Sequence, residues 1–314
     1  MSAQEETTGG KPYRILSLDG GGAKGFYTLG VLKEIEALVG HPLCKTFDLV
    51  FGTSTGGIIA ALIALGYKVD DIHELYKTYV PTIMKQKTKE GKSAALADLA
   101  TKVFGDAKFD DVKMKVGIVA TRWVQERPMI FKGSLDQAHG RHNTFAPGFG
   151  VSIGDAVQAS CSAYPLFCRK TVTTAAGDKV ELMDGGYCAN NPTLYAIADA
   201  IIALKLPHDA LRVVSVGVGV YPKPKPTTLR DKFINWLPSV QLLQKTLEIN
   251  TQSMDQLRTI LYKDIPTIRI NETFERPDMA TDFMEHDLDK LNILRQRGSE
   301  SYAKEELKLK EYLV

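Results

Sequence analysis

Short apolar runs rich in β-branched residues alternate with longer runs of helical character from Tyr13 onward. The first apolar run, RILSL, precedes FYTLGVLKEIEALV, and the second, FDLVFG, precedes GGIIAALIALG. Strands that alternate with helices build βαβ units, in which successive strands lie parallel. Further strand candidates are KVGIVAT, RPMIFK, KVELMD and LRVVSVGVG. This alternation predicts an α/β fold around a mainly parallel sheet.

The segment YPKPKPTT interrupts the alternation after LRVVSVGVG, because prolines end regular structure. Beyond it, the chain favours helix and carries charged runs such as YAKEELKLKEYL. We therefore predict a core over residues 13–220, followed by a helical C-terminal layer over residues 229–314. The layer is expected to pack on the same domain as the core.

The composition excludes several classes of protein. Of the 314 residues, 44% are hydrophobic and 24% are charged, which is typical of a globular chain and not of a disordered one. Lys and Arg (39) exceed Asp and Glu (37) by only 2, too even a balance for a protein that binds nucleic acid polymers. The four cysteines lack CxxC spacing, which favours a reducing compartment and argues against structural zinc.

The sequence indicates no targeting or membrane-spanning segment. The first residues, MSAQEETTGGKP, are polar and acidic, whereas a signal peptide begins with basic residues and continues with apolar ones. The longest run of small and apolar residues, from Gly56 to Gly66, has 11 residues, about half of the ~20 needed to cross a bilayer. We expect this run to form a buried helix and the protein to be cytoplasmic.

A glycine cluster, DGGGAKG at 19–25, stands directly between the first strand and its helix. Glycines there allow a tight turn whose N–H groups face an anion beside the positive end of the helix dipole. The cluster also satisfies GxGxxG, the dinucleotide-binding fingerprint. That fingerprint requires an acidic residue at the end of the next strand, but here the strand begins at Asp48 and ends at Gly52. A nucleotide-binding signalling protein that uses the 20–25 loop therefore stays as an alternative.

A second motif, GTSTG at 52–56, lies between the second strand and its helix. In a GxSxG turn of this kind the serine is exposed at the carboxyl edge of the sheet, so Ser54 is a candidate nucleophile. Two βα turns of one parallel sheet bring their helix N-termini to the same edge. The amides of the first glycine cluster are therefore expected to face the oxyanion formed when Ser54 attacks an acyl carbonyl.

The general base that would activate Ser54 has two candidates, a histidine or an aspartate. An α/β-hydrolase esterase with a Ser-Asp-His triad needs a histidine, but each histidine after Ser54 lies in a helical or polar loop context. By contrast, DGG at 184–186 directly follows the apolar strand VELM, so Asp184 can itself be the base. A simple Asp-Gly turn is the other interpretation. The histidines in question are His73, His139, His142, His208 and His286.

These three motifs, in this order and spacing, resemble those of patatin-like phospholipases over roughly Tyr13 to Ile197. The resemblance implies an α/β/α sandwich with a central, mostly parallel sheet, and hydrolysis of lipid acyl esters by a Ser-Asp dyad without histidine, metal or cofactor. By position, Ser54 is the nucleophile and Asp184 the base. The oxyanion loop is Gly20, Gly21 and Gly22, and the supporting glycines are Gly25, Gly52, Gly56, Gly185 and Gly186.

The resemblance also suggests partners. Some patatin-like enzymes are antiphage effectors that a cyclic oligonucleotide switches on, and a cytosolic phospholipase needs such restraint. The lysine run at 85–92, with Arg122, Arg127 and Lys132, is a candidate site for this anionic activator, which would shift an inactive conformer or oligomer towards an active one. A constitutive hydrolase with a solvated basic loop is the alternative. In either case the expected substrate is membrane phospholipid, cleaved peripherally at the inner membrane surface.

Overall fold

The computed structural model describes residues 11–224 and 238–314. Within them, eight strands form one sheet: seven lie in the order β5-β6-β3-β2-β1-β7-β8, and β4 pairs with β3 from Gly117 to Arg122, on the side opposite β2 and β6. The strands are β1 (Tyr13–Leu18), β2 (Leu49–Thr53), β3 (Lys115–Arg122), β4 (Arg127–Lys132), β5 (Lys170–Thr173), β6 (Lys179–Asp184), β7 (Leu211–Val216) and β8 (Thr267–Ile270). The helices are α1 (Gly25–Val39), α2 (Thr55–Leu65), α3 (Val69–Met84), α4 (Lys89–Phe104), α5 (Ile153–Ser160), α6 (Gly186–Ala189), α7 (Thr193–Ala198), α9 (Pro238–Leu261) and α10 (Leu288–Leu313).

The centre of the sheet is parallel and one edge is antiparallel. Strands β3, β2, β1, β7 and β8 run parallel to one another, whereas β4 and β6 lie antiparallel to β3, and β5 antiparallel to β6. Every strand candidate in the sequence forms a strand. The predicted mostly parallel sheet is confirmed, and its mixed edge is the refinement.

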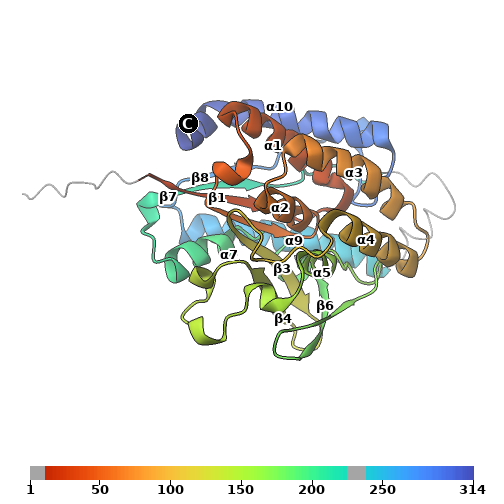
Figure 1. Ribbon diagram of the computed structural model, residues 1–314. Coiled ribbons are helices and arrows are strands. Elements are labelled where there is room, and N and C mark those ends of the chain that lie inside the picture. Colours follow the sequence, from red (N-terminus) through yellow and green to blue (C-terminus); the bar gives the residue numbers. More distant parts are fainter. Residues whose placement is uncertain (1–10, 225–237) are drawn as a thin grey trace, which may run out of the picture.

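Alternating residues of β1 enter two different cores, because neighbouring side chains of a strand point to opposite faces. Leu16 and Leu18 pack with α1, α2, α3, α5 and α10, whereas Ile15 packs with residues of α6 and α7. Figure 1 shows α1, α2, α3 and α10 on one side of the sheet and α7 on the other. The helices thus cover both faces, and the predicted α/β/α sandwich is confirmed.

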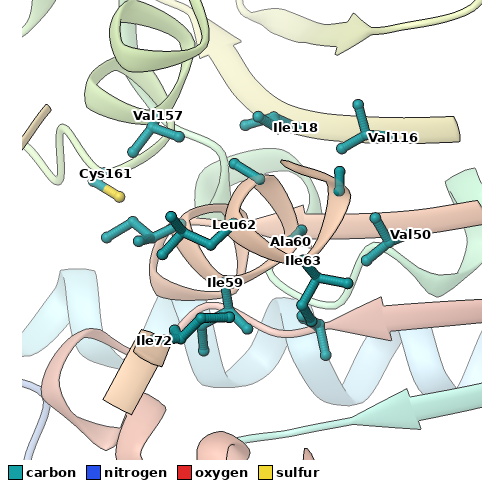
Figure 2. Close-up of a cluster of buried hydrophobic side chains, with 14 of the residues drawn as sticks. Val50, Ile59, Ala60, Leu62, Ile63, Ile72, Val116, Ile118, Val157 and Cys161 are labelled. Carbon is teal, nitrogen blue, oxygen red and sulfur yellow. The ribbon is translucent and has the colours of Figure 1, made fainter. Parts of the chain in front are cut away.

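Helix α2 is the predicted buried helix. Its residues from Ile59 to Ala64 are at most 1% exposed, so it is apolar on all sides. Figure 2 shows Ile59, Leu62 and Ile63 of this helix surrounded by side chains of β2, β3, α3 and α5. Its N-terminus is thereby held rigidly at the end of β2, where the GTSTG motif lies.

The C-terminal part contributes a strand as well as helices. Strand β8 extends the parallel sheet beside β7, which the charged, helix-favouring sequence did not indicate. Helix α10 lies along α1 (Figure 1), and Gly30 meets Gly298 where the two helices cross. The predicted boundary between residues 220 and 229 falls partly outside the described residues. No helix within residues 11–224 and 238–314 is long and apolar enough to span a membrane.

Candidate active site

Ser54 occupies a strained turn between β2 and α2. Its φ of 53° and ψ of −123° are rare for a residue with a side chain, and such strain is typical of functional positions. A Cβ atom on Gly52 would lie 2.1 Å from the carbonyl oxygen of Gly56, and one on Gly56 would lie 2.3 Å from that of Leu18. Both glycines of the GTSTG motif are therefore required by close backbone packing.

Ser160, at the end of α5, fixes the backbone of the elbow. The Ser54 N–H donates to the Ser160 hydroxyl at 2.8 Å, and this hydroxyl donates to the Val119 carbonyl at 2.6 Å. The sequence analysis missed this residue, although it belongs to the small-residue segment ASCSAYPLF. Its hydroxyl links the nucleophile turn to β3.

The hydroxyl of Ser54 donates a hydrogen bond of 2.7 Å to Oδ2 of Asp184. The Gly186 N–H donates to the other carboxylate oxygen, Oδ1, also at 2.7 Å. Asp184 is 2% exposed, and burial raises its pKa to about 6 although both hydrogen bonds oppose the rise. A Cβ on Gly185 would lie 2.1 Å from the Val119 carbonyl oxygen, so the DGG motif also needs its first glycine. We call Ser54 and Asp184 the dyad.

The glycine loop lies against the dyad. A Cβ on Gly20 would be 3.2 Å from the Cβ of Ser54. The Gly20 N–H, however, already donates to the Asn190 carbonyl at 2.9 Å. Among the described residues, the N–H groups of Gly21 and Gly22 have no such partner. Of the three predicted oxyanion donors, Gly20 thus has its N–H engaged, whereas Gly21 and Gly22 stay candidates.

Two further glycines of the loop are needed for shape. Gly22 has a φ of 58°, a conformation that favours glycine, and a Cβ there would lie 2.4 Å from the Phe283 carbonyl oxygen. A Cβ on Gly25, where α1 begins, would lie 2.4 Å from the hydroxyl of Thr55. The first helical turn of α1 can therefore approach the nucleophile elbow closely only because position 25 is glycine.

A cavity of about 610 Å³ opens onto the dyad and the glycine loop. Away from the dyad it is lined by apolar side chains of α2, α3 and α4, among them Leu62, Leu75, Ile83, Leu96 and Leu99. Tyr76 of α3 also lines it, with its hydroxyl bonded to Thr55. A cavity with an apolar wall and polar groups on other sides, some of them from α9, suits a ligand with a long hydrocarbon chain and a polar ester.

Asn190 connects the glycine loop to α9, and it too escaped the sequence analysis. Its side-chain amide donates to the Gly20 carbonyl at 3.2 Å and to the Thr251 hydroxyl at 2.7 Å. Its backbone N–H donates to Oδ1 of Asn250 at 2.7 Å. The signal available in the sequence was the run NNP shortly after the DGG motif, whereas nothing marked Asn250 or Thr251.

Two of the candidate histidines pair away from Ser54 and Asp184. His208 pairs with Asp264 through Nδ1 at 2.6 Å, and His139 pairs with Asp199 through Nε2 at 2.6 Å. In residues 11–224 and 238–314, which include all six histidines, no hydrogen bond joins an imidazole to Ser54 or Asp184.

The predicted basic cluster does not form one open surface. Lys92 is buried in α4, where its ammonium donates to the Met84 carbonyl at 2.7 Å. Lys132 forms an ion pair with the buried Asp199. Arg122 and Arg127 lie directly opposite each other on β3 and β4. Two of the expected cationic ligands therefore have protein partners, which argues against the cluster as a single activator site.

The comparisons with known proteins agree with this geometry. The family model described as patatin-like phospholipase matches residues 16–197, which contain the glycine loop, the elbow and the DGG motif. The chain is also 69% identical to the cUMP-AMP-activated phospholipase of Escherichia coli, over 96% of this chain and 94% of that protein. The chain belongs to the patatin-like phospholipase family. As a patatin-like phospholipase it is a carboxylic ester hydrolase.

More distant similarities extend beyond this relative. The patatin-like phospholipase is 28% identical to a cGAMP-activated phospholipase of Pseudomonas aeruginosa, over 67% of this chain and 63% of that one. Among solved structures, VipD from Legionella pneumophila is similar with a TM-score of 0.49 and 13% identity, over 97% of this chain and 67% of that chain.

Proposed function

We propose that this enzyme hydrolyses acyl esters of membrane phospholipids through the Ser54–Asp184 dyad and an acyl-enzyme. The observation that carries the proposal is the 2.7 Å hydrogen bond between Ser54 and Asp184 at the end of an apolar cavity. The cavity accommodates the acyl chain and leaves the ester carbonyl beside the Ser54 hydroxyl. The expected site of action is the membrane surface, which the enzyme reaches from the cytoplasm.

The chemistry has two halves. In the first, Ser54 Oγ attacks the ester carbonyl while Asp184 accepts its proton, and the amides of Gly21 and Gly22 stabilise the oxyanion. The lysolipid alkoxide leaves with that proton. In the second, Asp184 takes a proton from water and the hydroxide attacks the acyl-enzyme. As the bond between the acyl carbon and Ser54 Oγ breaks, Asp184 returns that proton to Oγ, and the fatty acid is released. The pKa of Asp184, raised to about 6, supports this role because a stronger base accepts the proton more readily.

We further infer that a cyclic dinucleotide switches the enzyme on. The support is the 69% identity, over 96% of this chain, to a phospholipase that is named for its activation by cUMP-AMP. Control by a second messenger suits an antiphage effector that must stay silent in a healthy cell. A change in homo-oligomeric state is one route by which the activator can act.

Fatty-acid release from phospholipid vesicles tests both parts of the proposal. We expect purified enzyme to release fatty acid from vesicles of phosphatidylethanolamine and phosphatidylglycerol strongly with cUMP-AMP and weakly without it. Ser54→Ala should be inactive under both conditions, whereas Ser299→Ala, a matched change on α10, should behave as wild type. Light scattering in parallel reports the assembly state.

Each outcome separates one alternative. Turnover by Ser54→Ala would refute the dyad, and equal activity with and without every nucleotide of a cyclic di- and trinucleotide panel would refute the switch. Nucleotide binding without any hydrolysis would favour the signalling protein that uses the 20–25 loop. Loss of activity on replacing a histidine in a folded variant would restore the triad esterase.

A further inference from the structure

A buried ion pair holds the first residue of the glycine loop. Asp19 directly follows β1 and is only 1% exposed. The guanidinium of Arg269, on β8, donates to Asp19 Oδ1 at 2.9 Å through Nη1 and to Oδ2 through Nη2. This two-pronged contact fixes the orientation of the carboxylate as well as its position. Arg269 lies outside residues 16–197, the range of the family model.

The arginine is itself held by a row of polar side chains across three strands. Ser17, Ser215 and Arg269 occupy neighbouring positions on β1, β7 and β8. Nη1 of Arg269 also donates to the Ser215 hydroxyl at 2.9 Å. The Thr193 hydroxyl contacts those of Ser17 at 2.9 Å and Ser215 at 2.8 Å. These three hydroxyl residues are at most 1% exposed, so the row is part of the rigid interior.

The glycine loop between its anchors is short. At its start, the Asp19 N–H donates to the Val216 carbonyl at 3.0 Å. At its end, the Ala23 N–H donates to the Phe283 carbonyl at 2.9 Å. Gly21 and Gly22 lie between these two points, and Gly21 packs so closely on Val218 that a Cβ there would come within 2.6 Å of that side chain. The direction of their N–H groups is therefore set by the anchors.

Stability alone does not account for a charged pair at this place. A buried ion pair loses much of its attraction to desolvation, and apolar replacements are often equally stable. Burial raises the pKa of Asp19, while the guanidinium beside it favours the ionised form. What the pair supplies, and what an apolar contact lacks, is direction.

We propose that Arg269 is a positioning residue of the hydrolase, which aims the oxyanion donors Gly21 and Gly22 by fixing the Asp19 carboxylate at the start of the glycine loop. This inference rests on the proposed function. It assigns a role in the reaction to β8, an element of the C-terminal part. A lysine at position 269 keeps the charge but cannot form the two parallel hydrogen bonds.

The test is Arg269→Lys, assayed with a soluble p-nitrophenyl acyl ester in the presence of cUMP-AMP. We expect kcat to fall by at least tenfold and up to ~10²-fold, as when oxyanion donors are misplaced, with KM unchanged within about twofold. KM is preserved because the acyl chain still binds the same cavity. Thermal unfolding is measured alongside to confirm that the variant is folded at the assay temperature.

The matched control is Arg276→Lys. Arg276 forms a two-pronged pair with Asp278 at 3.1 and 2.7 Å, but both side chains are exposed. It should keep wild-type kcat and KM. The proposal would be overturned if kcat of folded Arg269→Lys fell by less than tenfold. It would also be overturned if KM rose by as large a factor as kcat fell.

If Arg269→Lys does not fold, Asp19→Asn/Arg269→Gln replaces it, because this double variant leaves no buried charge unpaired. It should fold and show the same loss of kcat with unchanged KM, and wild-type kcat in it would overturn the proposal. The failure of the proposed function looks different: there, wild type and Ser54→Ala hydrolyse the ester equally. If wild type is active, Ser54→Ala is inactive and Arg269→Lys is fully active, the proposed function stands and only the role of Arg269 is refuted.

Discussion

The Asp184 carboxyl must be ionised to accept a proton, yet burial favours its neutral form. Its pKa of about 6 predicts an acid limb in the activity of the free enzyme. We expect kcat/KM to fall about tenfold for each unit of pH below about 6 and to be level above about 7. A pH profile with the soluble ester checks this, and constant kcat/KM down to pH 5 would contradict the assignment of Asp184 as the base.

The ionised Asp184 carboxylate should make the folded enzyme less stable at neutral pH than the protonated carboxyl does at low pH. Its pKa rises from 3.8 to about 6 on folding, so its contribution to stability is full below pH 3.8 and is lost as pH rises through about 6. Above pH 6 the loss is about 3 kcal/mol. Asp184→Asn should therefore have a higher Tm than wild type at pH 8, but not at pH 4.

Thermal unfolding at the two pH values measures this difference. Asp178→Asn is the matched control, because Asp178 is exposed in the turn between β5 and β6 and should change Tm little at either pH. An Asp184→Asn variant that is less stable than wild type at pH 8 would show that the ionised carboxyl stabilises the fold. Such a result would place the pKa of Asp184 below its ordinary value.

At the scale of single elements, the sequence predicts those features of the site that depend on local chain geometry. The glycine loop and the GTSTG turn each join a strand to a helix, so the motifs themselves indicate that Ser54 and Gly21 lie at the edge of the sheet. Arg269 of β8 bonds to Asp19 at the start of the glycine loop, and Asn250 of α9 accepts a hydrogen bond from Asn190, which holds that loop. Both contacts arise only through pairings between distant segments. A four-residue strand such as TIRI in a charged region carries no comparable signal.

The crossing of α1 and α10 depends on two glycines. A Cβ on Gly298 would lie 2.0 Å from the Tyr27 carbonyl oxygen, so the helices must separate to admit it. We expect Gly298→Ala to lower the free energy of unfolding by at least about 2 kcal/mol. Gly91→Ala, in the first turn of α4, meets only side-chain atoms at 3.2 Å or more and should change the free energy of unfolding by less than about 1 kcal/mol.

Chemical denaturation of both variants gives the comparison. If Gly298→Ala proved as stable as Gly91→Ala, the close approach of α1 and α10 would not contribute to stability in solution. Helix propensity favours alanine over glycine in the interior of α10, so a destabilised Gly298→Ala reports the packing of α10 on α1.

At the scale of the whole molecule, the alternation of strands and helices predicts the layers but not the order of the strands. Strand β6 places Asp184 beside Ser54 only because it pairs antiparallel with β3, next to β2. Neither the direction nor the neighbour of β6 can be read from KVELMD, since apolar alternation is the same in both orientations. The DGG motif after VELM therefore makes Asp184 only a candidate base, and the resemblance to the family favours that interpretation over a simple Asp-Gly turn.

A chain that stops after Asp287 tests how far the core relies on α10. The helix buries four leucines, Leu291, Leu294, Leu309 and Leu313, each at most 4% exposed. Burial of such a side chain contributes ~1.5–3 kcal/mol, so their loss together rivals the ~5–15 kcal/mol that stabilises a whole domain. We expect the shortened chain to be insoluble or unfolded, measured by circular dichroism and ester turnover. A folded, active product would contradict this.

The packing of α10 on α1 also sets a time for the enzyme to mature. Gly30 and Gly298 meet in the finished fold, yet 268 residues separate them in the sequence. At ~5–20 residues per second, a ribosome takes roughly 15 to 55 seconds to progress from one to the other. For most of that interval Ser54 has already been synthesised, but α10 is not yet there to cover its face of α1. The packing of α1 against α10 is therefore completed only after nearly the whole sequence to Leu313 has been synthesised.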